Sequence, residues 1–146
     1  MSEANQVLTV VVSCRGNPEC RYWGEDMFVD IDITNTGRVD VEFPLAFARK
    51  SGPYVTLINT RTGVETYLRR NLADPDLMTD FVRIRPGDSV SMEWVITSAE
   101  LEEFGGRSVD LSAEFRVAAD VKIGGKPVAF ENRDRVHIVG SRSPGS

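Results

Sequence analysis

Three aspartates share one short segment, and carboxylates on a loop are ligands that a hard cation such as calcium prefers. Asp74, Asp76 and Asp80 lie within NLADPDLMTD (71–80). An EF-hand calcium loop that began at Asp74 would need a glycine at its sixth position and a glutamate at its twelfth, where this chain has Thr79 and Arg85. We therefore favour a solvated loop, and a calcium-assisted loop is kept as the alternative.

The chain has two cysteines, Cys14 and Cys20, which enclose a segment with the turn signal Asn17-Pro18. A disulfide across so short a loop would stabilise the fold by roughly 2 kcal/mol. A cytosolic chain would keep both as thiols, which is the favoured interpretation, with a disulfide as the alternative. A zinc site needs more ligands than two cysteines and the single histidine supply. We expect no cofactor.

The single histidine, His137, alternates with Val136 and Ile138 in an apolar run. A nucleophilic triad needs an imidazole that a carboxylate orients next to a serine or cysteine. Because its neighbours pack inward, we expect a structural or surface histidine. The sequence also contains no G-x-S-x-G elbow, P-loop or G-x-G-x-x-G fingerprint. These observations argue against an enzyme.

The net charge of −5 and the pI near 4.9 argue against a nucleic-acid partner, since such proteins need a basic surface. The basic doublets Arg49-Lys50 and Arg69-Arg70 lie beside turn signals, where a solvated loop is the simplest interpretation. No apolar run approaches the roughly 20 residues that span a bilayer, so no membrane partner is expected. The first residues, MSEANQ, lack a basic region, which favours a cytoplasmic location.

Apolar and polar residues alternate with a period of two in FVDIDIT (28–34), SVSMEWVI (89–96) and SVDLSAEFRV (108–117). This pattern is typical of strands with one buried face. In the second of these strands, Val90, Met92, Trp94 and Ile96 share the predicted inner face and Glu93 the outer one. The register predicts that Trp94 belongs to the core.

Turn and helix signals complete the predicted fold. Pro44 interrupts the alternating run VDVEFPLAFA, and because proline cannot donate to a ladder we place that strand at a sheet edge or bulge. A capping box from Thr97 to Glu100 predicts one short helical turn near 98–104. The sequence predicts an all-β, immunoglobulin-like antiparallel β-sandwich of about seven to nine strands in a single domain, 1–140, with a flexible tail, 141–146.

Sandwiches bind partners through edge strands and loops, and a long loop is more often functional than a short one. The candidates are the edge strand with the loop that follows it, the 71–80 loop, and aromatic side chains near loops that could anchor a protein partner. The predicted partner-binding residues are Trp23, Pro44, Arg49, Lys50, Tyr54, Asp74 and Asp76.

Three segments, Ile33 to Gly37, Leu57 to Gly63 and Ile84 to Ser91, carry strand and turn motifs in a familiar order. This order resembles the immunoglobulin-like domains of the bacterial intracellular proteinase inhibitor group. It is also similar to the β-sandwich domain that precedes the catalytic domain in some deuterolysin-like metallopeptidases. The resemblance implies a small, non-enzymatic domain that contacts a peptidase through its loops. It assigns no site residues, because no inhibitory loop matches residue by residue.

The predicted function is therefore a non-catalytic protein-interaction domain that regulates or inhibits a peptidase. One alternative is a structural subunit of a phage or secretion assembly. A calcium-assisted binding module based on the 71–80 loop is the other.

Overall fold

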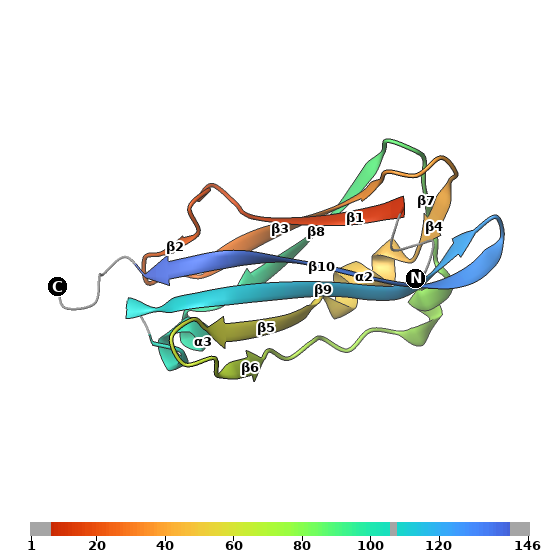
Figure 1. The fold of residues 1–146 in the computed structure, drawn as a ribbon. Coiled ribbons are helices and arrows are strands. Elements are labelled where there is room, and N and C mark those ends of the chain that lie inside the picture. Colours follow the sequence, from red (N-terminus) through yellow and green to blue (C-terminus); the bar gives the residue numbers. More distant parts are fainter. Residues whose placement is uncertain (1–6, 106–107, 141–146) are drawn as a thin grey trace.

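Strands in which apolar and polar residues alternate form two sheets that face each other across the core (Figure 1). The structure is a computed structural model that describes residues 7–105 and 108–140; the predicted tail, 141–146, lies outside them. The smaller sheet has the order β1 (Leu8–Cys14), β3 (Met27–Asn35) and β8 (Ser89–Ile96). All its pairs are antiparallel. The predicted all-β sandwich is confirmed.

The larger sheet is built around two long strands. It has the order β2 (Arg21–Tyr22), β10 (Lys126–Gly140), β9 (Asp110–Ile123), β4 (Val41–Phe43) and β7 (Val82–Ile84). A further strand, β5 (Tyr54–Asn59), pairs with β9 and carries β6 (Glu65–Tyr67) on its other side. The described residues thus form ten strands, and the two-residue β2, which is parallel to β10, accounts for the excess over the predicted range.

The hairpin of β9 and β10 is longer than the sequence pattern predicted. The alternating pattern placed a strand at 108–117, whereas β9 continues to Ile123 and pairs with β10 without interruption. They pair at fourteen successive positions from Lys126↔Ile123 to Val139↔Asp110. Gly124 and Gly125 close the turn with φ of 59° and 78°, and a two-residue hairpin turn of type I′ requires a positive φ at both central positions.

The core fills the space between the two sheets, and it is made of the inward members of each alternation. In β8, Met92 and Ile96 are buried and Trp94 packs partly buried against the core, as predicted. Trp94 lies on Gly52, where a Cβ would fall inside the indole ring. Gly52 also has a φ of 79°, so two constraints favour glycine at that position.

The prediction for Pro44 was wrong. The strand ends at Phe43, and Pro44 is the N-cap residue of a helix, α2 (Leu45–Ser51). Leu45, Ala48 and Ser51 are the buried residues of this helix, and their spacing of three is helical rather than alternating. Proline is tolerated here because a helix start leaves its first N–H groups unpaired anyway.

Helical structure also replaces two predicted loops. Arg49 and Lys50, expected on a loop, form the last turn of α2. The 71–80 segment contains a 3₁₀ helix, η1 (Pro75–Thr79). The predicted turn near 98–104 is confirmed as α3 (Ser98–Glu103), whose capping box forms as expected between Thr97 and Glu100.

The favoured thiol state of the cysteines was wrong, because Cys14 and Cys20 form a disulfide with a Cα to Cα distance of 5.4 Å. Backbone hydrogen bonds shape the turn that brings them together, from Asn17 N to the carbonyl of Cys14 and from Cys20 N to the carbonyl of Asn17. Both cysteines are buried. Disulfides are rare in cytosolic proteins, so this bond weakens the case for a cytoplasmic location.

We predict that replacing Cys14 and Cys20 together by serine lowers the free energy of unfolding by about 2 kcal/mol, the chain-entropy value for so short a loop. Urea denaturation of the oxidised protein, the reduced protein and the double variant measures the effect. The reduced protein should behave like the variant. An unchanged denaturation midpoint after reduction would contradict a stabilising disulfide.

We predict that Trp94→Ala costs roughly 2 to 3 kcal/mol of stability, somewhat less than the truncation of a fully buried aromatic residue, because the indole is only partly buried. The matched control is Glu93→Gln on the outer face of the same strand. Glu93 pairs with Arg15 at the surface, where ion pairs contribute little, so the expected change is below about 0.5 kcal/mol. Equal effects in chemical denaturation would refute the register.

Candidate functional site

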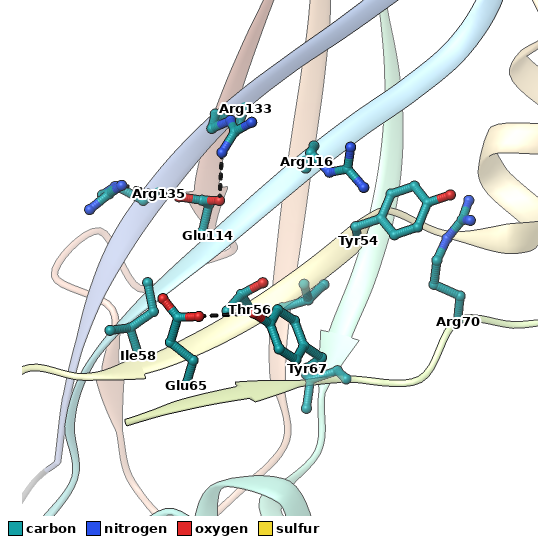
Figure 2. A pocket seen from close by; sticks show the side chains of 12 residues that line it. Tyr54, Thr56, Ile58, Glu65, Tyr67, Arg70, Glu114, Arg116, Arg133 and Arg135 are labelled. Atoms are coloured by element: carbon teal, nitrogen blue, oxygen red, sulfur yellow. Dashed lines mark hydrogen bonds and ion pairs between the residues drawn. The ribbon is translucent and has the colours of Figure 1, made fainter. Parts of the chain in front are cut away.

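The outer face of the larger sheet concentrates arginine and tyrosine side chains above a hollow of about 730 Å³ (Figure 2). The register places Tyr54 of β5 opposite Arg116 of β9, and Arg116 opposite Arg133 of β10. These residues point outward because their neighbours Val55, Phe115 and others fill the core. We call this surface the arginine–tyrosine face; it is made of Tyr54, Glu65, Tyr67, Arg70, Glu114, Arg116, Arg133 and Arg135, with the uncharged residues between them.

Ion pairs join the long hairpin's arginines into a ladder. Glu131 accepts from Arg116 at 3.1 Å and from Arg133 at 2.6 Å. Glu114 accepts from Arg133 at 3.2 Å and from Arg135 at 3.0 Å. A network of this kind holds its side chains in place better than isolated surface pairs do. The hydrogen bond from Arg133 lowers the pKa of Glu131 below its usual range, and Arg116 adds to the effect.

Tyr54 lies between two guanidinium groups, as Figure 2 shows. The central guanidinium carbon of Arg70 is 3.8 Å from the ring centroid, and that of Arg116 is 4.3 Å from it. Cations attract the electron-rich faces of an aromatic ring. Arg70 also donates from Nε and Nη2 to the carbonyl oxygen of Gly52, and from Nη2 to Ser51 Oγ. The arginine is therefore fixed in position.

A second hollow, of about 990 Å³, adjoins this face and is mainly apolar. We call it the apolar groove. It lies between α2 and η1 on one side and the turn half of the β9 and β10 hairpin on the other, and its apolar lining includes Pro44, Phe47, Pro75, Met78, Phe81 and Ala119. Tyr54 and Arg70 line both hollows, so the groove and the arginine–tyrosine face form one continuous surface.

The structure gathers part of the predicted binding residues at this surface. Pro44 and Tyr54 line the groove directly. The 71–80 segment contributes Pro75 and Met78, while Asp74 caps η1 by accepting from Asp76 N at 2.9 Å. The segment therefore lines the candidate site with apolar residues, and the carboxylates that suggested a calcium loop do not line the groove.

The other predicted binding residues lie elsewhere. Trp23 is 61% exposed and follows β2, at the opposite end of the sandwich from α2 (Figure 1). Arg49 donates to the carbonyl oxygen of Ser91 on β8. Lys50 is exposed in the last turn of α2. None of the three lines the groove or the arginine–tyrosine face.

A calcium site at the 71–80 segment gains no support. Within residues 7–105 and 108–140, no group of three His, Cys, Asp or Glu side chains is arranged to hold a metal ion. Asp74 already has a structural role as the N-cap of η1. Among the same residues, no helix is long and apolar enough to cross a membrane.

His137 has a carboxylate partner, but the geometry is not that of a nucleophilic triad. The carboxylate of Asp110 hydrogen-bonds both the His137 ring and, at 2.7 Å, the hydroxyl of Thr60. In a triad the imidazole stands between hydroxyl and carboxylate, whereas here the carboxylate stands between the other two. The His137 bond, followed by that of Thr60, lowers the pKa of Asp110.

No protein-family model matches the chain, and no curated protein matches it significantly. Among solved structures, a Northeast Structural Genomics Consortium target, SoR45, is similar with 10% identity and a TM-score of 0.44, over 90% of this chain and 87% of that chain. A Bordetella pertussis protein designated ApaA has 14% identity and a TM-score of 0.48, over 93% and 95%. A β-glucosidase from Listeria innocua has 14% identity and a TM-score of 0.32, over 91% of this chain but 16% of the enzyme. Likenesses this weak carry no conclusion about function.

Sequence reasoning named Tyr54 but missed the arginines of the arginine–tyrosine face. Arg70 was interpreted as part of a solvated doublet, yet it is half-buried while its neighbour Arg69 is exposed. Arg116 and Arg133 were outward positions of alternating strands with no distinguishing motif. Their spacing along the chain gives no sign that the register brings them beside Tyr54.

We predict that His137→Ala raises the pKa of Asp110 toward the ordinary aspartate value of about 3.9. The depressed pKa means that the pair stabilises the fold above the ordinary pKa, and that this stability is lost as the pH falls through the depressed value. Carboxyl ¹³C NMR titration measures the change. Asp30 is the control, because Arg15 lowers its pKa independently of His137. An Asp110 titration that is the same in both proteins would refute the assignment.

Proposed function

We propose that the chain is a non-catalytic protein-interaction domain that binds a segment of its partner along the apolar groove and the arginine–tyrosine face. One observation carries the proposal: a continuous apolar surface stays open to solvent, with Met78 44% exposed and Tyr54 37% exposed. Exposed apolar patches with a polar rim mark interaction sites. Tyrosine, arginine and methionine are also the side chains that protein interfaces favour.

The extent of the surface favours a polypeptide over a small molecule. Each hollow alone is large enough for a small ligand, since such pockets span roughly 300 to 1,000 Å³. The two hollows are joined through Tyr54 and Arg70, so that the surface follows the long hairpin from its ion-pair ladder to its turn half. An extended chain can use this length, whereas a compact ligand would leave most of it exposed.

Strand addition to the smaller sheet is disfavoured, which argues against its use in a self-assembling structural subunit. The outer edge of β1 is capped by side chains of β10: Val12 N donates to Asp134 Oδ2 at 2.8 Å, and Asn132 Nδ2 donates to the carbonyl oxygen of Leu8. The edge of β8 is capped by Arg49 at Ser91. Capped edges offer few free groups to a neighbouring strand.

A peptidase is the partner class that the sequence resemblance implies, and we include regulation or inhibition of a peptidase in the proposal. The cytoplasmic location stays a prediction. It requires a fold that survives reduction of the Cys14 and Cys20 bond, because cytosolic conditions keep thiols reduced.

We predict that Met78→Asp weakens partner binding by about tenfold or more, because a charge in the groove opposes the burial of apolar surface. The matched control is Leu72→Asp, which places the same charge on another residue of the 71–80 segment that is 95% exposed and does not line the groove. The immobilised wild type is used to capture partners from a cell lysate, and the captured proteins are identified by mass spectrometry. The purified partner is then titrated calorimetrically with the wild type, Met78→Asp and Leu72→Asp.

The wild type and Leu72→Asp should bind alike, and a retained peptidase should lose activity when the wild type is added. Equal affinity of Met78→Asp and wild type for the purified partner would refute the groove as the binding site. A partner without peptidase activity would refute only the peptidase part of the proposal.

A further inference from the structure

We propose that the segment bound at this surface is acidic as well as apolar, and that one of its carboxylates binds Arg70 beside Tyr54. The inference rests on the proposed function and specifies the chemistry of the partner. It predicts an extended peptide that places apolar side chains in the groove and an aspartate or glutamate at the junction of the two hollows.

Arg70 is a half-buried cation that lacks a carboxylate partner. Within the part of the chain that the structure describes, no acidic side chain lies within ion-pair distance of it. Its hydrogen bonds go to Gly52 and Ser51 and use Nε and Nη2, which leaves Nη1 without a bond among the described residues. A partly desolvated charge is unfavourable unless it is paired, so an incoming carboxylate would complete the site.

The position of Arg70 is fixed before any ligand binds. Gly52, which accepts two of its hydrogen bonds, ends α2 and packs against Trp94 of β8. The ring of Tyr54 covers the guanidinium at 3.8 Å. A planar guanidinium held in this way can bind a carboxylate through parallel hydrogen bonds with little loss of side-chain entropy.

The surrounding charges also favour an acidic ligand. Four arginines and two glutamates line the hollow of the arginine–tyrosine face, a balance of +2 in a chain whose net charge is −5. In the apolar groove the other charged residues are Lys122, Asp120 and Glu131. With Arg70, which lines both hollows, counted once, the joined surface has five cationic and four acidic side chains, a balance of +1. Since Glu114 and Glu131 pair with the arginines of the long hairpin, the cation beside Tyr54 that is left for a partner's carboxylate is Arg70, where complementary charge improves both association rate and specificity.

The apolar groove distinguishes a peptide from a free anion. Phe47, Met78 and Phe81 lie in the hollow that Arg70 shares, so the carboxylate site and the apolar site are contiguous. Inorganic phosphate would use only the guanidinium. A peptide that alternates or combines acidic and apolar side chains would use both parts.

The test is a selection of random peptides displayed on phage against the intact protein, followed by fluorescence anisotropy with a labelled synthetic peptide from the selection. We expect enrichment of aspartate or glutamate next to leucine, phenylalanine or similar residues. Arg70→Gln should weaken binding of this peptide by about tenfold, since hydrogen bonds between ionised groups are strong. The matched control, Arg69→Gln, removes the same charge from the exposed neighbouring position and should change binding less than about twofold.

A peptide in which the acidic residue is replaced by its amide tests the same contact without altering the protein, which covers the case that Arg70→Gln fails to fold. It should bind as weakly to the wild type as the original peptide binds to Arg70→Gln. Selected peptides that lack acidic residues, or that bind Arg70→Gln as they bind the wild type, would overturn the inference.

The same experiment separates this inference from the proposed function. Peptides that lose binding to Met78→Asp but carry no acid would uphold the groove and refute the acidic segment. If every selected peptide binds the wild type and Met78→Asp with equal affinity, both the groove as the binding site and the acidic segment are refuted. If inorganic phosphate binds in a way that depends on Arg70 and no selected peptide does, the site belongs to a free anion and the proposal of a bound peptide is overturned.

Discussion

The pairing of β9 with β10 is the constraint on which the rest of the structure depends. Their continuous register turns alternate residues of each strand to the inner side of the sheet and the residues between them to the outer side. On the inner side, Phe115 and Ile138 are fully buried. On the outer side the same register aligns Arg116 with Arg133. A shift by one residue would exchange the two faces and remove both the core and the ion-pair ladder.

The long hairpin also connects the two sheets. Asp134 and Asn132 of β10 bond the outer edge of β1, so the smaller sheet is closed on that side by side chains instead of by another strand. Arg49 of α2 has the corresponding role at β8. Polar side chains at sheet edges commonly prevent unwanted strand pairing. Here they leave the outer face of the larger sheet and the adjoining groove as the surface with the character of a binding site.

That surface depends on contacts from several distant segments. Gly52 ends α2, accommodates the indole of Trp94 and accepts hydrogen bonds from Arg70. Tyr54, two residues later, begins β5 and stacks against the same arginine. Packing at the core is therefore coupled directly to the position of the proposed carboxylate site. The coupling explains how a half-buried cation can be held in one place without a carboxylate of its own chain.

The sequence by itself determined the sandwich, the strand faces and the α3 capping box, because period-two alternation and capping are local properties of neighbouring residues. It misplaced Pro44 because a strand and a short helix share the same few apolar residues until buried spacing of three separates them. The tertiary structure alone decided that Cys14 bonds Cys20 and that Arg70 stacks on Tyr54. Local patterns specify which side a residue faces, whereas partners across strands follow from register and helix packing, which no single segment contains.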